Sequence, residues 1–344
     1  MNNQLHGVRN DLQALWRLEP KRYDAVQVRD KPFVAALALW VSHRRGVPFF
    51  YWMSFPVSEA SIRVARLHGL SLGFLRYAYM VVSGYLGMFI LYRIVGPRAD
   101  YIFVQSERMR QDLTARGIPL HQTMAVPMCV DPEFFSLERI SSTCAEFDGR
   151  EVVAYLGNCE RMRRPEFLLN VIAMLKKARP KILLLLIGDA VEEQDRAWLR
   201  AEVEARGCRE HVRITGWTTP VDAMAYLAQA RLAYSLTPPD PILDPATPTK
   251  LVEYMAMGKP VVANAHPDQS VVLERSGAGY CLPFDAQAFA TATVELLDNP
   301  VRAREMGERG RCYVLSHRSY LEMAKQVEAA YRSIMERRNP SKLC

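Results

Sequence analysis

The seven cysteines of this chain form no C-x-x-C pair and no metal-binding spacing with its seven histidines. Paired cysteines are typical of secreted disulfide frameworks and of structural zinc sites, so both are disfavoured. Residues 1–19 are polar and hold no apolar core, which argues against a secretory signal peptide. We therefore expect a protein of the reducing cytoplasm with no bound metal.

Two nucleotide-binding motifs are also missing. The sequence contains neither G-x-G-x-x-G nor G-x-x-x-x-G-K-[ST], which disfavours a dinucleotide-dependent dehydrogenase and a P-loop NTPase. It has no low-complexity tract, and its 49% hydrophobic and 24% charged residues are typical of globular proteins. A chain of 344 residues is long enough for two domains, each with its own core.

Acidic residues are scarce in the first part of the chain. Residues 1–100 contain thirteen Lys or Arg and six Asp or Glu, so they account for the whole formal charge of +7. Such a basic region suits an anionic partner such as phospholipid, pyrophosphate or nucleic acid. The alternative is an ordinary solvated surface, because the basic residues are scattered rather than clustered.

Charge is absent altogether between Arg76 and Arg93, over sixteen residues. A membrane-spanning helix needs about 20 apolar residues, and glycines and tyrosines interrupt this run, so we expect it not to span a bilayer. For residues 67–95 we expect a helix lying in the plane of an anionic membrane surface, with tyrosines at headgroup level and arginines on lipid phosphates. A plain core helix is the equal alternative.

Apolar strand-like segments alternate with helical segments along the chain, which predicts parallel sheets covered by helices on both faces. The polar stretch 136–150 lacks clear periodicity and is the best candidate for a domain boundary. We predict a first domain at 1–145, a second at 151–317, and a final helix with its tail at 318–344. Doubly wound domains bind ligands outside the carboxyl ends of their strands. Those ends carry Gly157-Asn158, Gly188-Asp189, Gly216-Trp217 and the loop Pro238–Asp240.

The stretch 247–263 has the clearest chemistry. We expect Thr247 to cap a helix whose first residue is Pro248, and Gly258 to end it in the left-handed conformation. Lys250 and Glu253 lie three residues apart on one face of its first turn. A lysine at a helix N-terminus attracts phosphate, and a carboxylate one turn later can hold a sugar diol. Phosphate beside ribose indicates a nucleotide, although an ordinary surface pair is the alternative.

This stretch resembles the donor-binding helix of retaining glycosyltransferases of family 4, whose members carry the run Ser-Pro-x-Lys-Leu-x-Glu-Tyr-Met-Ala-x-Gly-Lys-Pro-Val-Val. The resemblance covers about residues 20–335. It implies an α/β protein with the GT-B fold, two Rossmann-like doubly wound domains and a C-terminal helix that crosses back to the first. It also implies a metal-independent hexosyltransferase that acts on a nucleotide sugar of UDP or GDP type and needs no further cofactor.

The resemblance assigns roles to individual residues. The segment 155–164 is similar to a Gly-Arg-Leu-x-x-x-Lys-Gly loop that contacts the donor's diphosphate, with Arg163 in the lysine's place and Asn158 replacing the arginine. Arg161 would supply the missing charge, although solvent exposure is the alternative for any one arginine. Trp217 would stack on the nucleobase, with core packing as the alternative. We predict catalytic roles for Arg163, Lys250 and Glu253, and donor binding by Gly157, Asn158, Arg161, Gly188, Asp189, Gly216, Trp217, Thr249 and Leu251.

Three departures from the family pattern stand out. Ala246 replaces the first of two glutamates, with Asp244 as the nearest carboxylate. Cys129 stands where a glycine is usual and is expected to be tolerated or to strain its turn. The family's first strand and Gly-rich loop have no counterpart before the helix expected at residues 8–18.

These observations lead to one preferred function and two alternatives. We expect sugar transfer in polysaccharide or lipid-linked glycan synthesis, with a lipid-linked acceptor taken by the first domain and with no nucleic-acid partner. Such a protein would be cytoplasmic, with peripheral attachment to the inner face of the cytoplasmic membrane. The alternatives are a non-catalytic GT-B protein that binds a nucleotide or a partner enzyme, and a nucleotide-sugar 2-epimerase.

Overall fold

The computed structural model describes residues 10–11, 13–19, 22–135 and 147–338, and the chain forms two compact units. Unit 1 comprises Met1–Pro127 and Ala324–Cys344, and unit 2 comprises Met128–Met323. The expected boundary at 136–150 lies largely outside the described residues, and the chain passes from one unit to the other after Pro127.

Unit 1 is built on a four-stranded parallel sheet in the order β1-β2-β3-β4. Side chains of β2 alternate between the two faces, as the pleat of a strand requires. Tyr51 and Met53 pack with Leu39 of a helix on one face. On the other face Phe50 meets the ring of Tyr331 at 4.6 Å between centroids. The strands are β1 (Val26–Arg29), β2 (Phe49–Met53), β3 (Tyr101–Val104) and β4 (Thr123–Ala125).

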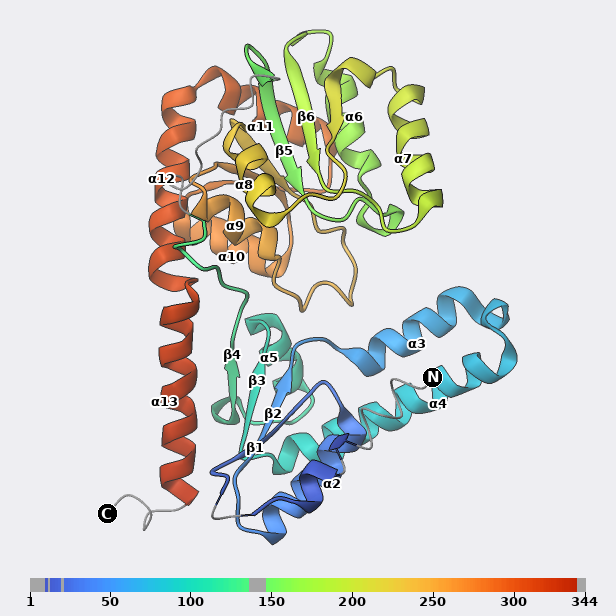
Figure 1. The fold of residues 1–344 in the computed structure, drawn as a ribbon, viewed down its shortest axis with the longest axis vertical. Helices are drawn as coiled ribbons and strands as arrows, with labels where there is room; N and C mark the ends of the chain where they lie inside the picture. The colour runs from blue at the N-terminus through green and yellow to red at the C-terminus, as the bar shows by residue number, and fades with distance from the viewer. Residues whose placement is uncertain (1–9, 12, 20–21, 136–146, 339–344) are drawn as a thin grey trace. The chain divides into compact units, whose positions relative to one another are not determined.

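Helices cover both faces of this sheet (Figure 1). The helix that carries Tyr331 is the last of the chain, so the C-terminal helix returns to unit 1 as predicted. The helices of unit 1 are α2 (Pro32–Arg44), α3 (Val57–His68), α4 (Phe74–Phe89), α5 (Glu107–Ala115) and the C-terminal part of α13 (Tyr320–Arg338).

The uncharged run becomes α4, which continues into a π-helical turn, η2 (Ile90–Val95). By length and composition Phe74–Arg98 is long and apolar enough to cross a membrane, and 28% of its most apolar window is buried. Leu91 and Val95 of η2 lie in the core of unit 1. The core-helix alternative is therefore correct for η2 and wrong for most of α4.

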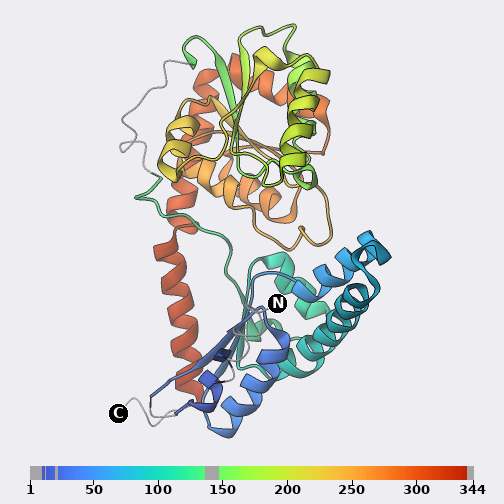
Figure 2. The same ribbon diagram turned by 45° about the vertical axis from the view of Figure 1, so that its right-hand side comes forward.

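Two glycines bring α4 against α3, and the helices form a hairpin (Figures 1 and 2). A Cβ atom on Gly84 would lie 2.5 Å from Cγ1 of Ile62, and one on Gly87 would lie 2.5 Å from Oγ of Ser58. Because the small side of α4 faces α3, its large apolar side chains remain on the outside of the hairpin.

Unit 2 contains a six-stranded, fully parallel sheet in the order β10-β9-β8-β5-β6-β7. The chain runs outward from β5 to β7 and then returns to β8 on the other side of β5. This reversal is the topological switch point at which such sheets bind ligands. The strands are β5 (Glu151–Leu156), β6 (Ile182–Ile187), β7 (Val212–Ile214), β8 (Leu232–Ser235), β9 (Val261–Asn264) and β10 (Gly279–Leu282).

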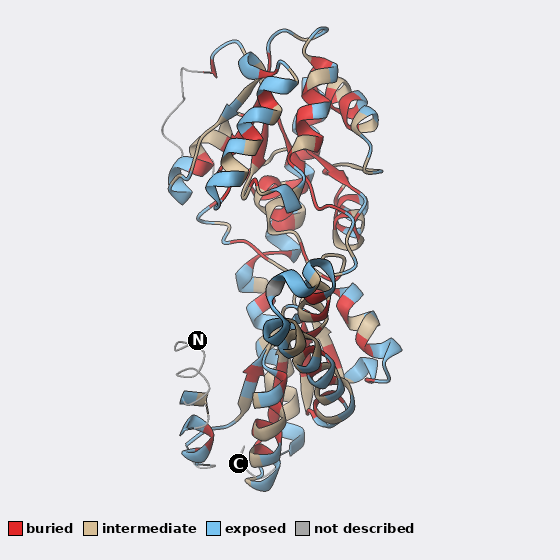
Figure 3. Ribbon diagram, turned by 90° about the vertical axis from the view of Figure 1, so that its right-hand side faces the viewer, coloured by how far each residue is buried: buried red, intermediate tan, exposed pale blue. Residues whose placement is uncertain are grey.

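Both faces of this sheet are buried, as the continuous apolar run of β6 predicts. Leu184 and Leu186 face a cluster with the helices α6 and α11, whereas Leu183 and Leu185 face a second cluster with α8 and α9. The buried strands stand out in red in Figure 3. The helices are α6 (Glu166–Leu175), α7 (Glu193–Ala205), α8 (Pro220–Ala228), α9 (Thr249–Ala256), α10 (Pro267–Ser276), α11 (Ala286–Asp298) and α12 (Pro300–His317).

Candidate functional site

The carboxyl ends of the strands of unit 2 lie along one edge of the sheet, because all strands are parallel. Gly157 follows β5, Gly188 follows β6 and Gly216 follows β7. Helix α9 comes after β8, which is the other neighbour of β5. The predicted strand-end residues and the predicted phosphate-binding helix therefore belong to the same edge of the sheet.

Helix α9 begins one residue later than the sequence predicts. Pro248 has φ −68° and ψ 109°, so it occupies the cap position, and Thr249 is the first helical residue. The hydroxyl of Thr247 accepts a hydrogen bond from the backbone N–H of Met128 at 2.9 Å and does not cap the helix. The predicted cap is therefore wrong. Pro248 has no side-chain hydrogen bond to the first turn of α9, so the cap residue leaves the first N–H groups of this helix without a side-chain partner.

Two glycines allow the strand ends to approach each other. Gly157 has φ 128° and Gly188 has φ 133°, a region that other residues rarely adopt. A Cβ atom on Gly188 would lie 2.3 Å from the carbonyl oxygen of Gly157. A Cβ atom on Gly157 would lie 2.8 Å from Cε of Lys250, so this glycine makes room for the lysine.

Lys250 lies at the centre of this arrangement. Its Nζ donates a hydrogen bond to the hydroxyl of Tyr155 at 2.6 Å and lies 4.1 Å from the centroid of that ring. Within the described part of the chain no carboxylate forms an ion pair with it. Burial, followed by the nearby charge of Arg163, lowers the pKa of Lys250 to about 7. A partly buried ammonium group whose hydrogen-bond partner is a neutral hydroxyl would be stabilised by a bound anion.

The three arginines of the loop after β5 have different surroundings. Arg161 pairs with Asp195 at 3.1 Å and lies over Trp198, both on α7. Arg164 has φ 54° and pairs with Glu166 at 3.4 Å.

Arg163 alone of the three is partly buried and close enough to Lys250 to lower its pKa. Among the described residues its guanidinium forms no ion pair. Arg163 and Lys250 are thus two neighbouring cations that lack an anion. The predicted role of Arg161 stays a prediction, since its side chain is engaged by α7.

Glu253 lies one turn after Lys250 and is partly buried. Burial raises the pKa of its carboxyl group, and the charge of Lys250 opposes that effect. Leu251 is fully buried, so its side chain packs in the core. Tyr254 is buried as well, and its hydroxyl accepts a hydrogen bond from the N–H of Leu156 at 2.7 Å. This bond ties α9 to the end of β5.

The remaining predicted residues shape the loops of the same edge. The side-chain oxygen of Asn158 accepts from the N–H of Glu160 at 2.9 Å, and that of Asp189 accepts from the N–H of Ala190 at 2.8 Å. Trp217 is 59% exposed, so the core-packing alternative for it is wrong. Its exposed ring remains available for stacking. Cys129 lacks the positive φ that would strain its turn.

Sequence reasoning missed Tyr155 and Tyr254, the two partners that hold Lys250 and α9. Both are buried tyrosines, and a buried tyrosine hydroxyl usually finds a hydrogen-bond partner. That general rule was the only signal available, and it names no partner. The sequence also gave no indication that Asp195 would engage Arg161.

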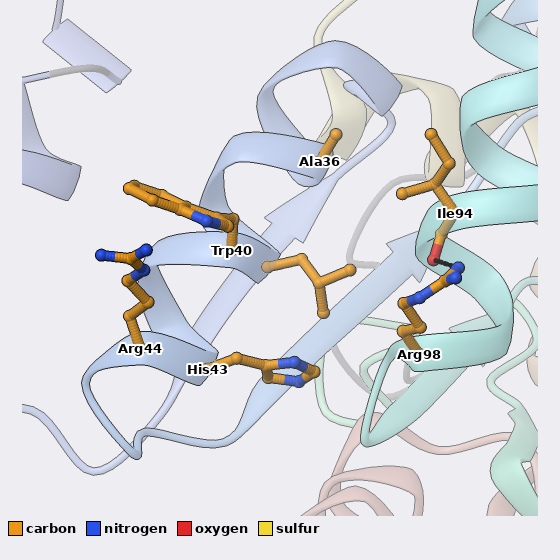
Figure 4. A pocket seen from close by; sticks show the side chains of 7 residues that line it. Ala36, Trp40, His43, Arg44, Ile94 and Arg98 are labelled. Atoms are coloured by element: carbon orange, nitrogen blue, oxygen red, sulfur yellow. Dashed lines mark hydrogen bonds between the residues drawn. The ribbon is translucent and has the colours of Figure 1, made fainter.

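Unit 1 carries a pocket of about 600 Å³ between α2 and η2 (Figure 4). A guanidinium nitrogen of Arg98 donates to the carbonyl oxygen of Ile94 at 3.2 Å. The guanidinium of Arg44 lies over the ring of Trp40, with Cζ 4.7 Å from its centroid. The pocket is lined by Ala36, Leu39, Trp40, His43, Arg44, Ile94 and Arg98. None of the predicted donor-binding residues belongs to it.

In the part of the chain that the structure describes, no group of His, Cys, Asp and Glu is placed to hold a metal ion.

The chain matches two family models. Residues 138–312 match the model of the glycosyl transferases group 1, and residues 3–129 match the glycosyl transferase 4-like domain. The chain belongs to the group 1 glycosyltransferases. No curated protein matches it by sequence. The predictions of a glycosyltransferase and of its fold are therefore confirmed at the level of the family.

Solved structures show the same fold as this glycosyltransferase. HepE of Anabaena, in complex with UDP, has a TM-score of 0.74 at 16% identity, over 95% of this chain and 81% of HepE. A glycosyltransferase of Rickettsia africae has a TM-score of 0.64 at 13% identity, over 91% and 100% of the two chains. Sucrose-phosphate synthase of Thermosynechococcus elongatus has a TM-score of 0.63 at 20% identity, over 91% and 74%. These similarities confirm the predicted GT-B architecture.

Proposed function

We propose that this glycosyltransferase moves a hexosyl group from a UDP-sugar to an acceptor hydroxyl, with retention of the anomeric configuration. One observation carries the proposal. Lys250 and Arg163 present neighbouring positive charges at the switch point, beside the uncapped N-terminus of α9. A diphosphate has the charge and the size to satisfy all three groups.

The chemistry follows from this placement. The bond between the anomeric carbon and the β-phosphate oxygen breaks, and the leaving diphosphate gains negative charge. Lys250, Arg163 and the first N–H groups of α9 stabilise that charge, which is the largest contribution expected at such a site. The acceptor oxygen bonds to the anomeric carbon on the face the diphosphate leaves, and its proton passes to that diphosphate. Glu253 accepts hydrogen bonds from the ribose hydroxyls.

The base and the sugar class are proposed from the structural neighbours. HepE was solved with UDP, with UDP and glucose, and with UDP-glucose. The pneumococcal O-GlcNAc transferase GtfA was solved with UDP and GlcNAc. Trp217, exposed after β7, is the candidate partner of the base. We propose further that the reaction needs no metal or other cofactor, because the cationic groups already supply the charge.

The biological setting is also a proposal. A basic unit 1 suits a lipid-linked glycan acceptor, and we propose a role in polysaccharide or lipid-linked glycan synthesis on the cytoplasmic side of the membrane. The charge of residues 1–100 supports this setting, since lipid-linked acceptors carry phosphates.

A panel of nucleotides tests the donor assignment. UDP is expected to raise the melting temperature more than GDP or ADP, because the proposal assigns uridine as the donor base. A ligand at a hundred times its dissociation constant stabilises a protein by about 2.7 kcal/mol. UDP-sugars that bind are then incubated with and without a lipid-phosphate acceptor, and the anomeric configuration of the product is read by NMR. Preference for GDP would refute the uridine assignment. Epimerised donor without acceptor would indicate a 2-epimerase, and binding without turnover a non-catalytic protein.

Donor affinity is expected to fall as pH rises above neutrality. In the free enzyme the pKa of Lys250 is about 7. Of the two forms of this side chain only the protonated one attracts the diphosphate, so the fraction of protein with a charged Lys250 falls above that pH. A bound diphosphate raises this pKa, so binding near pH 8 takes up a proton. Calorimetry with a UDP-sugar in buffers of different ionisation enthalpy measures the uptake. The diphosphate diester does not itself titrate in this range.

Lys250→Arg is the matched variant for the pH dependence, because arginine stays charged throughout this range. Its donor affinity should be nearly independent of pH between about 6 and 9, whatever its absolute value. An equal pH dependence in Lys250→Arg and in the unmodified protein would assign the titration to another group.

A further inference from the structure

Helix α4 exposes a continuous apolar stripe. Leu75, Tyr79, Val82, Leu86 and Phe89 follow one another at intervals of three or four residues, which places them on one face of the helix. Their exposed fractions are 83%, 71%, 63%, 47% and 57%. Isolated exposed leucines are ordinary, but a full stripe of large apolar side chains marks a binding surface.

The tip of the hairpin continues this surface. Leu67 is 70% exposed and Leu70 is 67% exposed where α3 ends, and Phe74 is 71% exposed where α4 begins. Much of the hairpin is pale blue in Figure 3, where it faces the viewer. The apolar surface therefore runs along α4 and around the turn.

The charge around this surface is mainly positive, and the one carboxylate in the sequence of the hairpin, Glu59 of α3, is paired with Arg116. Residues 60–99 contain five arginines and no Asp or Glu. Arg76 and Arg93 are both exposed, near the two ends of the stripe. Arg66 donates a hydrogen bond to the hydroxyl of Tyr85 at 2.8 Å, which holds an arginine beside an exposed tyrosine of α4. Arginine and tyrosine next to apolar side chains match the headgroup region of an anionic membrane.

The hairpin is anchored in unit 1, so α4 cannot leave it to span a bilayer without disrupting the fold. Leu91 and Val95, which follow α4 in the same continuous segment, are core residues. On α3, Glu59 accepts a hydrogen bond from the hydroxyl of Tyr92 and pairs with Arg116 at 3.2 Å. These contacts hold the base of the hairpin in unit 1, so its exposed apolar surface can enter an apolar medium only from the outside of the hairpin and its tip.

A second copy of the chain is a poorer occupant of this surface. A twofold interface through this surface would bring the arginines of one hairpin close to those of the other, and like charges oppose that association. An anionic lipid surface offers the opposite sign together with apolar chains. The charge of the hairpin therefore favours lipid over self-association.

We infer that the α3–α4 hairpin binds the surface of an anionic phospholipid bilayer, with the apolar stripe of α4 in the acyl–headgroup boundary and the flanking arginines on lipid phosphates. The inference rests on the proposed function only in that the bilayer bound by the hairpin would be the one that contains the lipid-linked acceptor. Binding itself requires neither donor nor acceptor.

Co-sedimentation of the full chain with vesicles tests the inference. Vesicles of phosphatidylcholine with added phosphatidylglycerol should bind the protein, and those of phosphatidylcholine alone should bind it at least about tenfold more weakly. Added salt should weaken the binding to anionic vesicles. The double variant Leu75→Gln/Leu86→Gln should lose about tenfold or more in affinity. Arg76→Gln/Arg93→Gln should reduce only the preference for anionic lipid.

Val301→Gln is the matched control, because Val301 is 70% exposed on α12, far along the chain in unit 2. It should bind vesicles like the unmodified protein. All exposed-site variants should keep the melting temperature and the response to UDP, which separates a failure here from a failure of the donor assignment. Unchanged vesicle binding by Leu75→Gln/Leu86→Gln overturns the inference. The inference is also overturned if the unmodified protein does not bind vesicles but forms a dimer, and Leu75→Gln/Leu86→Gln dissociates that dimer.

Discussion

Replacing Lys250 by methionine is expected to lower kcat by about 10²–10³-fold while the protein stays folded. The amine is the central cation of the site, and its only hydrogen-bond partner in the described part of the chain is the neutral hydroxyl of Tyr155. Methionine keeps the apolar length of the side chain and removes the charge. Steady-state turnover of the UDP-sugar, with circular dichroism and melting temperature as folding readouts, measures the effect.

The same replacement should also make the protein slightly more stable in the absence of ligand. The amine has a lowered pKa because its charged form is disfavoured by burial. Below the folded-state pKa, Lys250 is charged in both the folded and the unfolded protein, and the buried charge lowers the free energy of unfolding by its full amount. This destabilisation decreases as pH rises toward the pKa of the unfolded protein. The gain from methionine should therefore be larger at pH 6 than at pH 10.

Lys259 provides a matched control, since it is also partly buried and nine positions further along the chain. Its ammonium donates to the carbonyl oxygens of Ala228 and Ala230 at 2.7 and 2.8 Å, where α8 ends. Lys259→Met removes the donor to these two carbonyl oxygens and should leave kcat of the folded protein unchanged. Full turnover in Lys250→Met would refute the assigned role, and equal losses in both variants would point to a structural effect.

Replacing Gly188 by alanine is expected to destabilise unit 2 by roughly 3 kcal/mol or more and to abolish donor binding. The new Cβ atom would lie 2.3 Å from the carbonyl oxygen of Gly157, and position 188 has a φ of 133°, which alanine rarely adopts. Backbone must then shift, and Gly157 is in contact with Lys250. Chemical denaturation and UDP titration measure the two effects.

Gly149→Ala separates the clash from ordinary backbone strain. Gly149 has φ 73° and no atom within 4 Å of its missing Cβ, so the variant should cost about 1 kcal/mol and leave donor binding intact. Tight UDP binding by Gly188→Ala would show that the two strand ends can separate without harm to the site.

Local patterns were sufficient for most of the fold. The alternation of apolar strands and helices predicted parallel sheets, which both units have, and the α13 segment returns to unit 1 as predicted. These elements are set by short-range periodicity and by glycines at their ends, which the sequence displays directly. The motif around Lys250 also predicted a helix there, and the structure has α9 at Thr249–Ala256.

Partners distant in the sequence were not predictable in this way. Thr247 reads as a helix cap, but its hydroxyl bonds the N–H of Met128, and Pro248 takes the cap position. Arg161 reads as a phosphate ligand, but α7 brings Asp195 against it. In each case a local rule competes with a contact that exists only after the units have folded.

The amino-acid sequence by itself determined the fold class, the glycosyltransferase family and the helix that carries Lys250 and Glu253. Tertiary structure alone decided which charges meet. The sheet order places β5 beside β8 and thereby brings Tyr155 to Lys250, 95 residues apart, with Arg163 near them. It also decided that α4 keeps its apolar stripe on the outside, because Gly84 and Gly87 turn its small side toward α3. Periodicity reports that a face is apolar, whereas only packing determines what covers it.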